Sequence, residues 1–380
     1  MRVRSNVSFV VSLWLWSSLC LASSHGNATS DPLPYAIVRQ ALQQALHLNF
    51  QEAFDTARQL KAGDQPTLIA QLTSGIIAYL QVRWQTPAAR KRAEHALETV
   101  LTMAQKPNGE RLKKPQRQLV QGTAAVFLAL LRQQHEAWAS MQLFARGEKW
   151  LREALIANET LTDAHLGLGA LYFAGTDLPL LLRRALRSLR TPSPAEAMYH
   201  LRRAITTGHF AQDLARTLLA EVYEREKQYR DAITLGQKLT EAFPENGFYA
   251  LLTGRSQCAY AQYAACAATL ATLAARLATS KVRLVRRTDR FDLYYFWGRA
   301  LYERHDYKRA FQAFRRAINA DPRLEKDETL WATYYLAKLY EYQGQIKTAR
   351  QMYQTLLRRR NVADLHAQVE RCLARLQRSR

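Results

Sequence analysis

The chain has 380 residues, with 54 lysine and arginine side chains against 32 aspartate and glutamate side chains, so its formal net charge is +22. Its 15 glycines and 11 prolines make up about 7% of the residues, against roughly 12% in average proteins. So few turn-forming residues argue against an all-β sandwich or barrel, and a hydrophobic fraction of 48% argues against general disorder. The length fits two or three ordinary domains or one long repeat array.

The first 24 residues have the pattern of a secretory signal peptide. Two arginines precede an apolar stretch over residues 7–22, and small residues follow it before His25. The apolar stretch is shorter than the roughly 20 residues that a membrane-spanning helix needs, so a retained anchor is the weaker alternative. Cys20 raises lipidation as another alternative, which the bulky residue before it disfavours. We therefore expect an exported protein, periplasmic or envelope-associated.

The C-terminal half repeats itself at an interval of about 34 residues. Each unit has a small residue in its first helix, a second small residue twelve positions later and an apolar residue seven positions further on. Such spacing predicts two antiparallel helices that approach closely where the small residues face each other, and each hairpin buries its apolar face against the next. The predicted hairpins cover 213–246, 247–280, 291–324 and 330–363, and a capping helix over 364–380 follows them.

These spacings resemble the tetratricopeptide repeat (TPR) family of helix–turn–helix solenoids. The resemblance implies an all-α, right-handed superhelical solenoid of about eight helical hairpins plus a C-terminal capping helix. Residues 162–246 also look like a group of exported bacterial TPR proteins that includes the T-component of some periplasmic transporters. The family motif is matched best within residues 291–324, by Gly298, Ala310, Phe314, Ala317 and Pro322.

The N-terminal half is less regular. We expect degenerate TPR-like hairpins over 25–160, among them helical pairs over 66–105 and 116–157. A further hairpin over 161–212 is interrupted, because about 16 additional residues separate its two helices. The whole array is expected to form one continuous solenoid rather than separable domains.

No catalytic, cofactor or metal-binding motif is complete in this sequence. His135-Glu136 lacks the second histidine of a metalloprotease helix, and Cys258 and Cys266 are not spaced as a redox or zinc pair. We therefore expect a non-catalytic protein without a cofactor or a metal ion. The two cysteines lie on neighbouring predicted helices. A disulfide bond between them is one possibility, and two separate buried thiols are the other.

Aromatic and cationic side chains alternate on the first helices of the C-terminal hairpins. In the TPR family these helices line the concave side of the solenoid. Such a face suits an extended protein segment, because rings bury area at little entropy cost and arginine pairs with carboxylates. The alternative is that some of the rings pack between neighbouring units. The expected groove residues are Phe248, Arg255, Tyr295, Arg299, Tyr302, Trp331, Tyr334, Lys338 and Tyr342.

Positive charge is concentrated in three segments. Their attraction to anionic lipid, envelope polymer or acidic protein is one interpretation, and a merely solvated arginine-rich surface is the other. The signal peptide argues against a nucleic acid partner. The segments are Arg183, Arg184 and Arg187 with Arg190; Lys281, Arg283, Arg286 and Arg287 with Arg290; and Arg358, Arg359 and Arg360.

The leading hypothesis is an exported, non-catalytic TPR scaffold or adaptor that binds a protein or peptide partner through its concave face. Two alternatives remain. One is a periplasmic transport-accessory protein with a ligand pocket near residues 162–207. The other binds an anionic membrane or envelope polymer through the basic segments.

Overall fold

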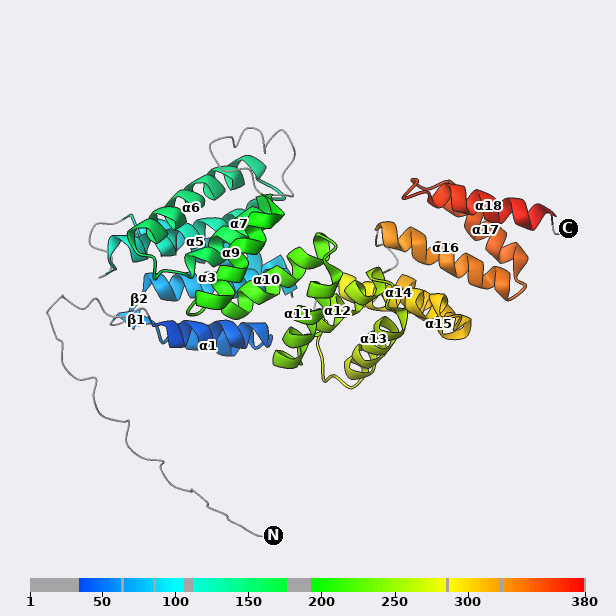
Figure 1. The fold of residues 1–380 in the computed structure, drawn as a ribbon, viewed down its shortest axis with the longest axis horizontal. Helices are drawn as coiled ribbons and strands as arrows, with labels where there is room; N and C mark the ends of the chain where they lie inside the picture. The colour runs from blue at the N-terminus through cyan, green and yellow to red at the C-terminus, as the bar shows by residue number, and fades with distance from the viewer. Residues whose placement is uncertain are drawn as a thin grey trace, which may run out of the picture. The chain divides into compact units, whose positions relative to one another are not determined.

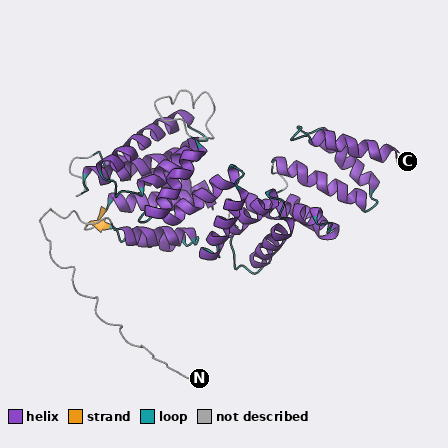
Figure 2. Ribbon diagram, viewed as in Figure 1, coloured by secondary structure: helices purple, strands orange, loops and turns teal. Residues whose placement is uncertain are grey.

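The structure is a computed structural model, and it describes residues 34–62, 65–84, 87–105, 112–175, 193–284, 287–321, 324 and 326–378. The predicted signal peptide and the whole insertion, residues 177–192, lie outside the described residues. Nearly all described residues are helical, and the helices follow one another in chain order (Figures 1 and 2). The expected all-α, TPR-like fold is confirmed. None of the described helices is both long and apolar enough to cross a membrane.

The N-terminal half contains four helical pairs, and the two helices of each pair pack against each other. A ladder of two-residue strands, β1 (Lys61–Ala62) and β2 (Gln65–Pro66), precedes the second pair, and a short 3-10 helix, η1 (Pro87–Ala89), lies within it. The pairs are α1 (Tyr35–Leu46) with α2 (Phe50–Ala57), α3 (Leu68–Trp84) with α4 (Arg90–Met103), α5 (Lys114–Arg132) with α6 (Ala137–Ala157), and α7 (Ala164–Gly175) with α9 (Pro194–Thr207).

Each of the four C-terminal repeats likewise contains one pair of packed helices, and a final helix packs on the last pair. The second helix of each pair also packs on the first helix of the next pair, which is how the hairpins stack. The elements are α10 (Gln212–Arg225) with α11 (Tyr229–Ala242), α12 (Gly247–Ala259) with α13 (Tyr263–Ala278), α14 (Arg287–Glu303) with α15 (Tyr307–Ala320), α16 (Asp327–Tyr342) with α17 (Ile346–Leu357), and α18 (Leu365–Arg378).

The turn within a hairpin recurs at a fixed place. Seven residues after the small residue of the first helix, the chain adopts a left-handed conformation with φ between 59° and 77°. The next backbone N–H then donates to a carbonyl five residues earlier, as Asp306 does to Leu301 at 2.9 Å. This arrangement ends a helix and reverses the chain. The left-handed residues are Leu48, Lys227, Ala261, His305 and Gly344.

The close approach of paired helices depends on glycines. Gly122 and Gly147 face each other across α5 and α6, as expected for two small residues, and Gly122 also lies against Leu151. A Cβ atom on Gly254 would lie 2.7 Å from Cγ of Leu270, four residues after the small partner. Each glycine thus makes room for one large side chain. The same relation joins Gly75 to Leu97, Gly122 to Leu151, Gly169 to Leu201 and Gly298 to Phe314.

The first helices of the N-terminal pairs close a ring. α1 packs on α3, α3 on α5, α5 on α7, α7 on α10, and α10 packs back on α1. Tyr35 stacks on His209 with ring centroids 4.6 Å apart, and Gln43 Nε2 donates to Asp213 Oδ2 at 3.0 Å. α7 is buried at 11 of its 12 residues, and Arg83 of α3 pairs with Glu221 of α10. Side chains therefore fill the concave side of these N-terminal helices.

A buried carboxylate fixes the loop that leads into α10. Asp163 accepts hydrogen bonds from the backbone N–H groups of His209, Phe210 and Ala211 at 3.0 to 3.1 Å. Burial raises the pKa of Asp163, and these hydrogen bonds oppose the rise. The loop is thereby held where Tyr35 and Arg39 of α1 contact His209.

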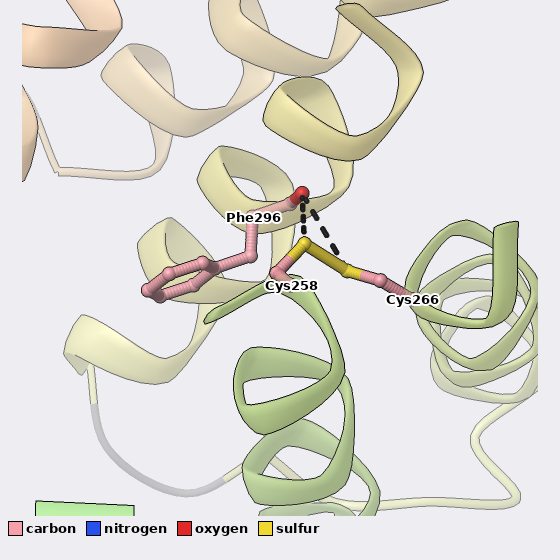
Figure 3. The surroundings of a disulfide bond; sticks show 3 residues. All are labelled: Cys258, Cys266 and Phe296. Carbon is pink, nitrogen blue, oxygen red and sulfur yellow. Dashed lines mark hydrogen bonds between the residues drawn. A yellow bond between two sulfur atoms is a disulfide. The ribbon is translucent and has the colours of Figure 1, made fainter. Parts of the chain in front are cut away.

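A disulfide bond joins the two helices of the second C-terminal repeat (Figure 3). Cys258 of α12 and Cys266 of α13 are bonded, with their Cα atoms 5.4 Å apart. The carbonyl oxygen of Phe296 in α14 lies 3.4 Å from Cys258 Sγ, so that the bridge also touches the next repeat. Of the two possibilities that the sequence leaves open, the structure has the bond. Cys372 is a free, buried thiol.

The contact of Gly254 with Leu270 can be tested by a double-mutant cycle. Gly254→Val is expected to lower the free energy of unfolding by about 1–3 kcal/mol through overpacking, and Leu270→Ala by about 2–5 kcal/mol through the cavity it leaves. The double variant should lose less than the sum, because valine fills the space that leucine vacates. Urea unfolding measures all three. Losses that add to within about 0.5 kcal/mol would contradict the contact.

Candidate functional site

Three of the nine predicted groove residues are instead core residues. Phe248, Tyr295 and Tyr334 are only 4 to 5% exposed. Phe248 packs near Trp84 of α3 and against Tyr249, and Tyr295 stacks on Phe291 with centroids 5.9 Å apart. Tyr334 packs against Trp331 at 5.5 Å and against Tyr353 of α17. Their assignment to a binding surface was wrong, because neighbouring helices cover the side of the helix on which they lie.

Arg255 belongs to a row of ion pairs that connects successive first helices. It contacts Glu224 of α10 at 2.6 Å and Asp292 of α14 at 3.6 Å. Lys326, just before α16, lies 3.3 Å from the same Asp292. Burial opposes the charge on Arg255, but Glu224 and Asp292 outweigh it and raise its pKa. Arg255 is therefore engaged within the protein and is not available to a partner.

The other members of the predicted set differ in exposure. Arg299 and Trp331 are half-buried on α14 and α16, and Trp331 packs on Tyr334 and Tyr335. Tyr302, Lys338 and Tyr342, however, come together near the turn between α14 and α15. These three predicted groove residues therefore remain candidates for binding a partner, and they lie at one place on the C-terminal repeats.

We call this place the tyrosine–lysine site; it consists of Tyr302, Tyr307, Lys338, Tyr342 and Arg375. The ring of Tyr307 lies 4.6 Å from that of Tyr342 and 5.3 Å from that of Tyr302, between centroids. These side chains line a cavity of about 260 Å³, together with Leu339 and Glu341. Tyr342 is 70% exposed. α14, α15, α16 and α18 each contribute a residue.

The charge of the site is positive. Lys338 Nζ lies 5.2 Å from the ring centroid of Tyr302 and 5.7 Å from that of Tyr334, and no described carboxylate pairs with it. Arg375 is paired with Glu341 at 2.7 Å, and Glu341 also accepts a hydrogen bond from Tyr353. Glu341 is therefore satisfied. Lys338, which has no described carboxylate partner, lines the same cavity as the half-buried rings of Tyr302 and Tyr307 and the exposed ring of Tyr342. A carboxylate carried next to an apolar group fits this arrangement.

Tyr307 and Tyr342 also line a second, larger cavity of about 490 Å³ along α15. Its cations are Lys308, Arg315 and Arg316, all exposed, and no acidic residue lines it. Arg315 lies over the ring of Phe311 and Arg316 over the ring of Tyr294, each at 5.8 Å from the centroid. The two cavities share the tyrosine pair, and a bound segment could extend from one into the other.

Sequence reasoning missed two members of the site. Tyr307 stands at the first position of the second helix, where Tyr229 and Tyr263 recur in earlier repeats, so it reads as part of the repeat framework. Arg375 lies on the capping helix, which was expected only to cover an apolar face. The local spacing marked neither residue, because the cavity is formed by residues of four different helices.

The predicted basic surface is only partly described. Arg183, Arg184, Arg187 and Arg286 lie outside the described residues, and so does the side chain of Arg287. Lys281 and Arg283 are exposed. The backbone of Arg283 exchanges hydrogen bonds with Glu245 and Gly247, and its side chain donates to Asn49 at 3.3 Å. This part of the segment therefore has a structural role between α12 and α1.

A buried polar cluster occupies the region for which a ligand pocket was considered. His165 Nδ1 lies 2.7 Å from His200 Nδ1, and Tyr172 donates to Glu148 at 2.5 Å. Burial and then Arg203 lower the pKa of His165 to about 4, so that this ring is neutral at pH 7. The cluster joins α6, α7 and α9. Among the described residues, no group of histidine, cysteine, aspartate and glutamate could hold a metal ion.

The sequence matches no protein-family model and no curated protein. Solved structures are similar at low identity. MamA from Desulfovibrio magneticus shares 18% identity over 47% of this chain and 93% of that one, with a TM-score of 0.35. A TPR protein from Cytophaga hutchinsonii shares 14% over 76% and 96%, with 0.38, and one from Parabacteroides merdae 12% over 80% and 98%, with 0.34.

These TM-scores are too low to carry an argument about function, and the repeat geometry of the chain itself decides the fold. Paired helices, a left-handed turn residue at a fixed place and a glycine under a large side chain recur along the chain. The described part of the chain has a TPR-like helical-repeat fold. The tyrosine–lysine site lies on its last two hairpins and the capping helix.

Loss of Arg255 should destabilise this TPR-like protein in a pH-dependent way. Arg255→Met leaves the buried carboxylates of Glu224 and Asp292 without the cation that they share. This loss is expected to cost about 3–5 kcal/mol of unfolding free energy at pH 7. Burial already raises the pKa of both carboxyl groups, and removal of the cation raises it further. The folded variant then binds more protons than the unfolded chain, so its deficit against wild type shrinks as the pH falls.

Urea unfolding of both proteins at pH 7.5 and pH 5 measures this deficit. The matched control is Arg371→Met, on the exposed surface of α18. It should change the free energy of unfolding by less than about 0.5 kcal/mol. A deficit for Arg255→Met that is equal at the two pH values would show that the ion pairs do not stabilise the repeats.

Proposed function

We propose that the chain is an exported, non-catalytic scaffold that binds an acidic segment of a protein partner at the tyrosine–lysine site. One observation carries the proposal: Tyr342 is 70% exposed beside Tyr307, and Lys338 between the rings has no described carboxylate partner. Elsewhere on the first helices, Phe248, Tyr295 and Tyr334 are buried, and Arg255 is paired with Glu224 and Asp292. At the tyrosine–lysine site, an exposed ring and a cation are both available to a partner.

The chemistry of the site favours a protein segment. Tyrosine offers a large contact area at a small cost in side-chain entropy, and a hydroxyl group for hydrogen bonding. Lys338, and beyond it Lys308, Arg315 and Arg316, would pair with aspartate or glutamate side chains. We expect a segment that combines an aromatic or aliphatic residue with several carboxylates. The net charge of +22 would speed its encounter with such a partner.

Export is supported by two independent features. Residues 1–24 have the composition of a signal peptide, and Cys258 is bonded to Cys266. Disulfide bonds persist in oxidising compartments and are rare in the cytosol. The buried polar groups around His165 and Glu148 bond to one another across α6, α7 and α9, which supports a structural role for them rather than a catalytic one.

Selection from a random peptide library, followed by measurement of dissociation constants by fluorescence anisotropy, tests the proposal. Enriched peptides should carry carboxylates beside an aromatic or aliphatic residue. The double variant Lys338→Glu with Tyr342→Ala should bind them at least about thirtyfold more weakly, which corresponds to roughly 2 kcal/mol.

The matched control changes the same residue types elsewhere. Trp138 is 62% exposed on α6, and Lys238 is exposed on α11, so Trp138→Ala with Lys238→Glu removes a ring and reverses a charge away from the site. This control should keep the wild-type affinity. Enriched peptides without acidic residues, or equal losses in the two double variants, would refute the proposed site.

A further inference from the structure

We propose that a separate cavity, between the start of α16 and the end of α17, binds a phosphorylated polyol such as a glycerol phosphate. The cavity has a volume of about 610 Å³ and does not overlap the tyrosine–lysine site. Three kinds of residue line it: four cations, three threonines and three leucines. They are Lys326, Arg358, Arg359 and Arg360; Thr329, Thr333 and Thr355; and Leu324, Leu330 and Leu356.

Two of the four cations are already neutralised. Lys326 Nζ lies 3.3 Å from Asp292, and Arg360 pairs with Asp327. Arg358 and Arg359 are exposed, and neither has a carboxylate partner in the described part of the chain. The cavity therefore presents two uncompensated guanidinium groups from adjacent residues. A phosphomonoester carries up to two charges on one group, whereas a carboxylate carries one, so phosphate matches this pair better.

The threonines of the cavity offer acceptors and not donors. Thr329 Oγ1 donates to the carbonyl of Leu324, Thr333 Oγ1 to Thr329 and Thr355 Oγ1 to Gln351, each at 2.9 Å. A hydroxyl group has one proton to donate and lone pairs to accept with. Because these protons are already engaged, the three oxygens can only accept hydrogen bonds from a ligand. An anion without hydroxyl groups, such as sulfate, would gain nothing from them.

The ligand that satisfies both sets of groups carries a phosphate and hydroxyl donors on one small skeleton. Its phosphate would pair with Arg358 and Arg359, its hydroxyl groups would donate to the threonines, and its C–H surface would contact Leu324 and Leu330. A free polyol phosphate and the headgroup of phosphatidylglycerol share this chemistry. Binding of the polyol phosphate from either source would not depend on the tyrosine–lysine site.

Isothermal titration of the full mature chain with sn-glycerol 3-phosphate, sulfate and glycerol tests the proposal. Glycerol phosphate should bind more tightly than sulfate, and glycerol should not bind measurably. Arg358→Gln with Arg359→Gln should weaken binding by about tenfold or more, since charge-assisted hydrogen bonds are lost. Thr329→Val with Thr355→Val should weaken the binding of glycerol phosphate and leave that of sulfate unchanged.

The control variant, Arg371→Gln with Arg378→Gln, removes two exposed arginines of α18 and should bind as wild type does. Thermal unfolding checks that every variant is folded. Sedimentation with phosphatidylglycerol vesicles, against phosphatidylcholine vesicles, then assigns the source. Arginine-dependent binding to the vesicles indicates the lipid headgroup, and binding of the free compound alone indicates a soluble ligand. Absence of binding, or binding that persists in the Arg358 and Arg359 double variant, would overturn the proposal.

Discussion

The structure depends on the close approach of two helices at a residue without a side chain. In five hairpins a glycine of the first helix lies beneath a leucine or phenylalanine of the second, as Gly298 does beneath Phe314. Protein interiors are close-packed, so the large side chain fills the space that the glycine leaves. This contact fixes the position of the two helices relative to each other along their axes. In two of these hairpins, those of Gly254 and Gly298, a left-handed turn residue follows seven positions later. Stacking of such hairpins follows, since each leaves an apolar face for the next.

Ring closure in the N-terminal half decides where function can reside. Contacts between α1 and α10, and the Arg83–Glu221 pair between α3 and α10, fill the concave side of these helices. Further along the chain, the row of ion pairs through Arg255 and Asp292 neutralises the inner charges as far as Lys326. Exposed rings and unpaired cations remain on the last two hairpins and the capping helix. Both proposed sites, one for an acidic protein segment and one for a polyol phosphate, lie there.

The sequence predicts the hairpins well because their signals are local. Small residues, the turn and the closing apolar residue all lie within one 34-residue unit. α10 to α17 lie at the predicted repeats, although α10, α14 and α16 begin one to four residues earlier, and α18 lies within the predicted capping segment. It predicts the binding surface less well because exposure depends on distant residues. Counting positions along α12 places Phe248 on the inner side, but Trp84, more than 160 residues earlier, lies against that side. Tyr342, by contrast, is 70% exposed, which its position in the repeat does not reveal. The disulfide between Cys258 and Cys266 could not be decided from spacing alone.

The central claim is that the N-terminal helices form one closed, cooperative ring while the last hairpins stay open. Hydrogen–deuterium exchange of the backbone amides, followed by mass spectrometry, measures this directly. The account predicts that α1, α7 and α10 lose protection together and more slowly than α16 to α18. Earlier exchange of α1 than of α10, with α7 unprotected, would contradict ring closure and with it the confinement of binding to the C-terminal repeats.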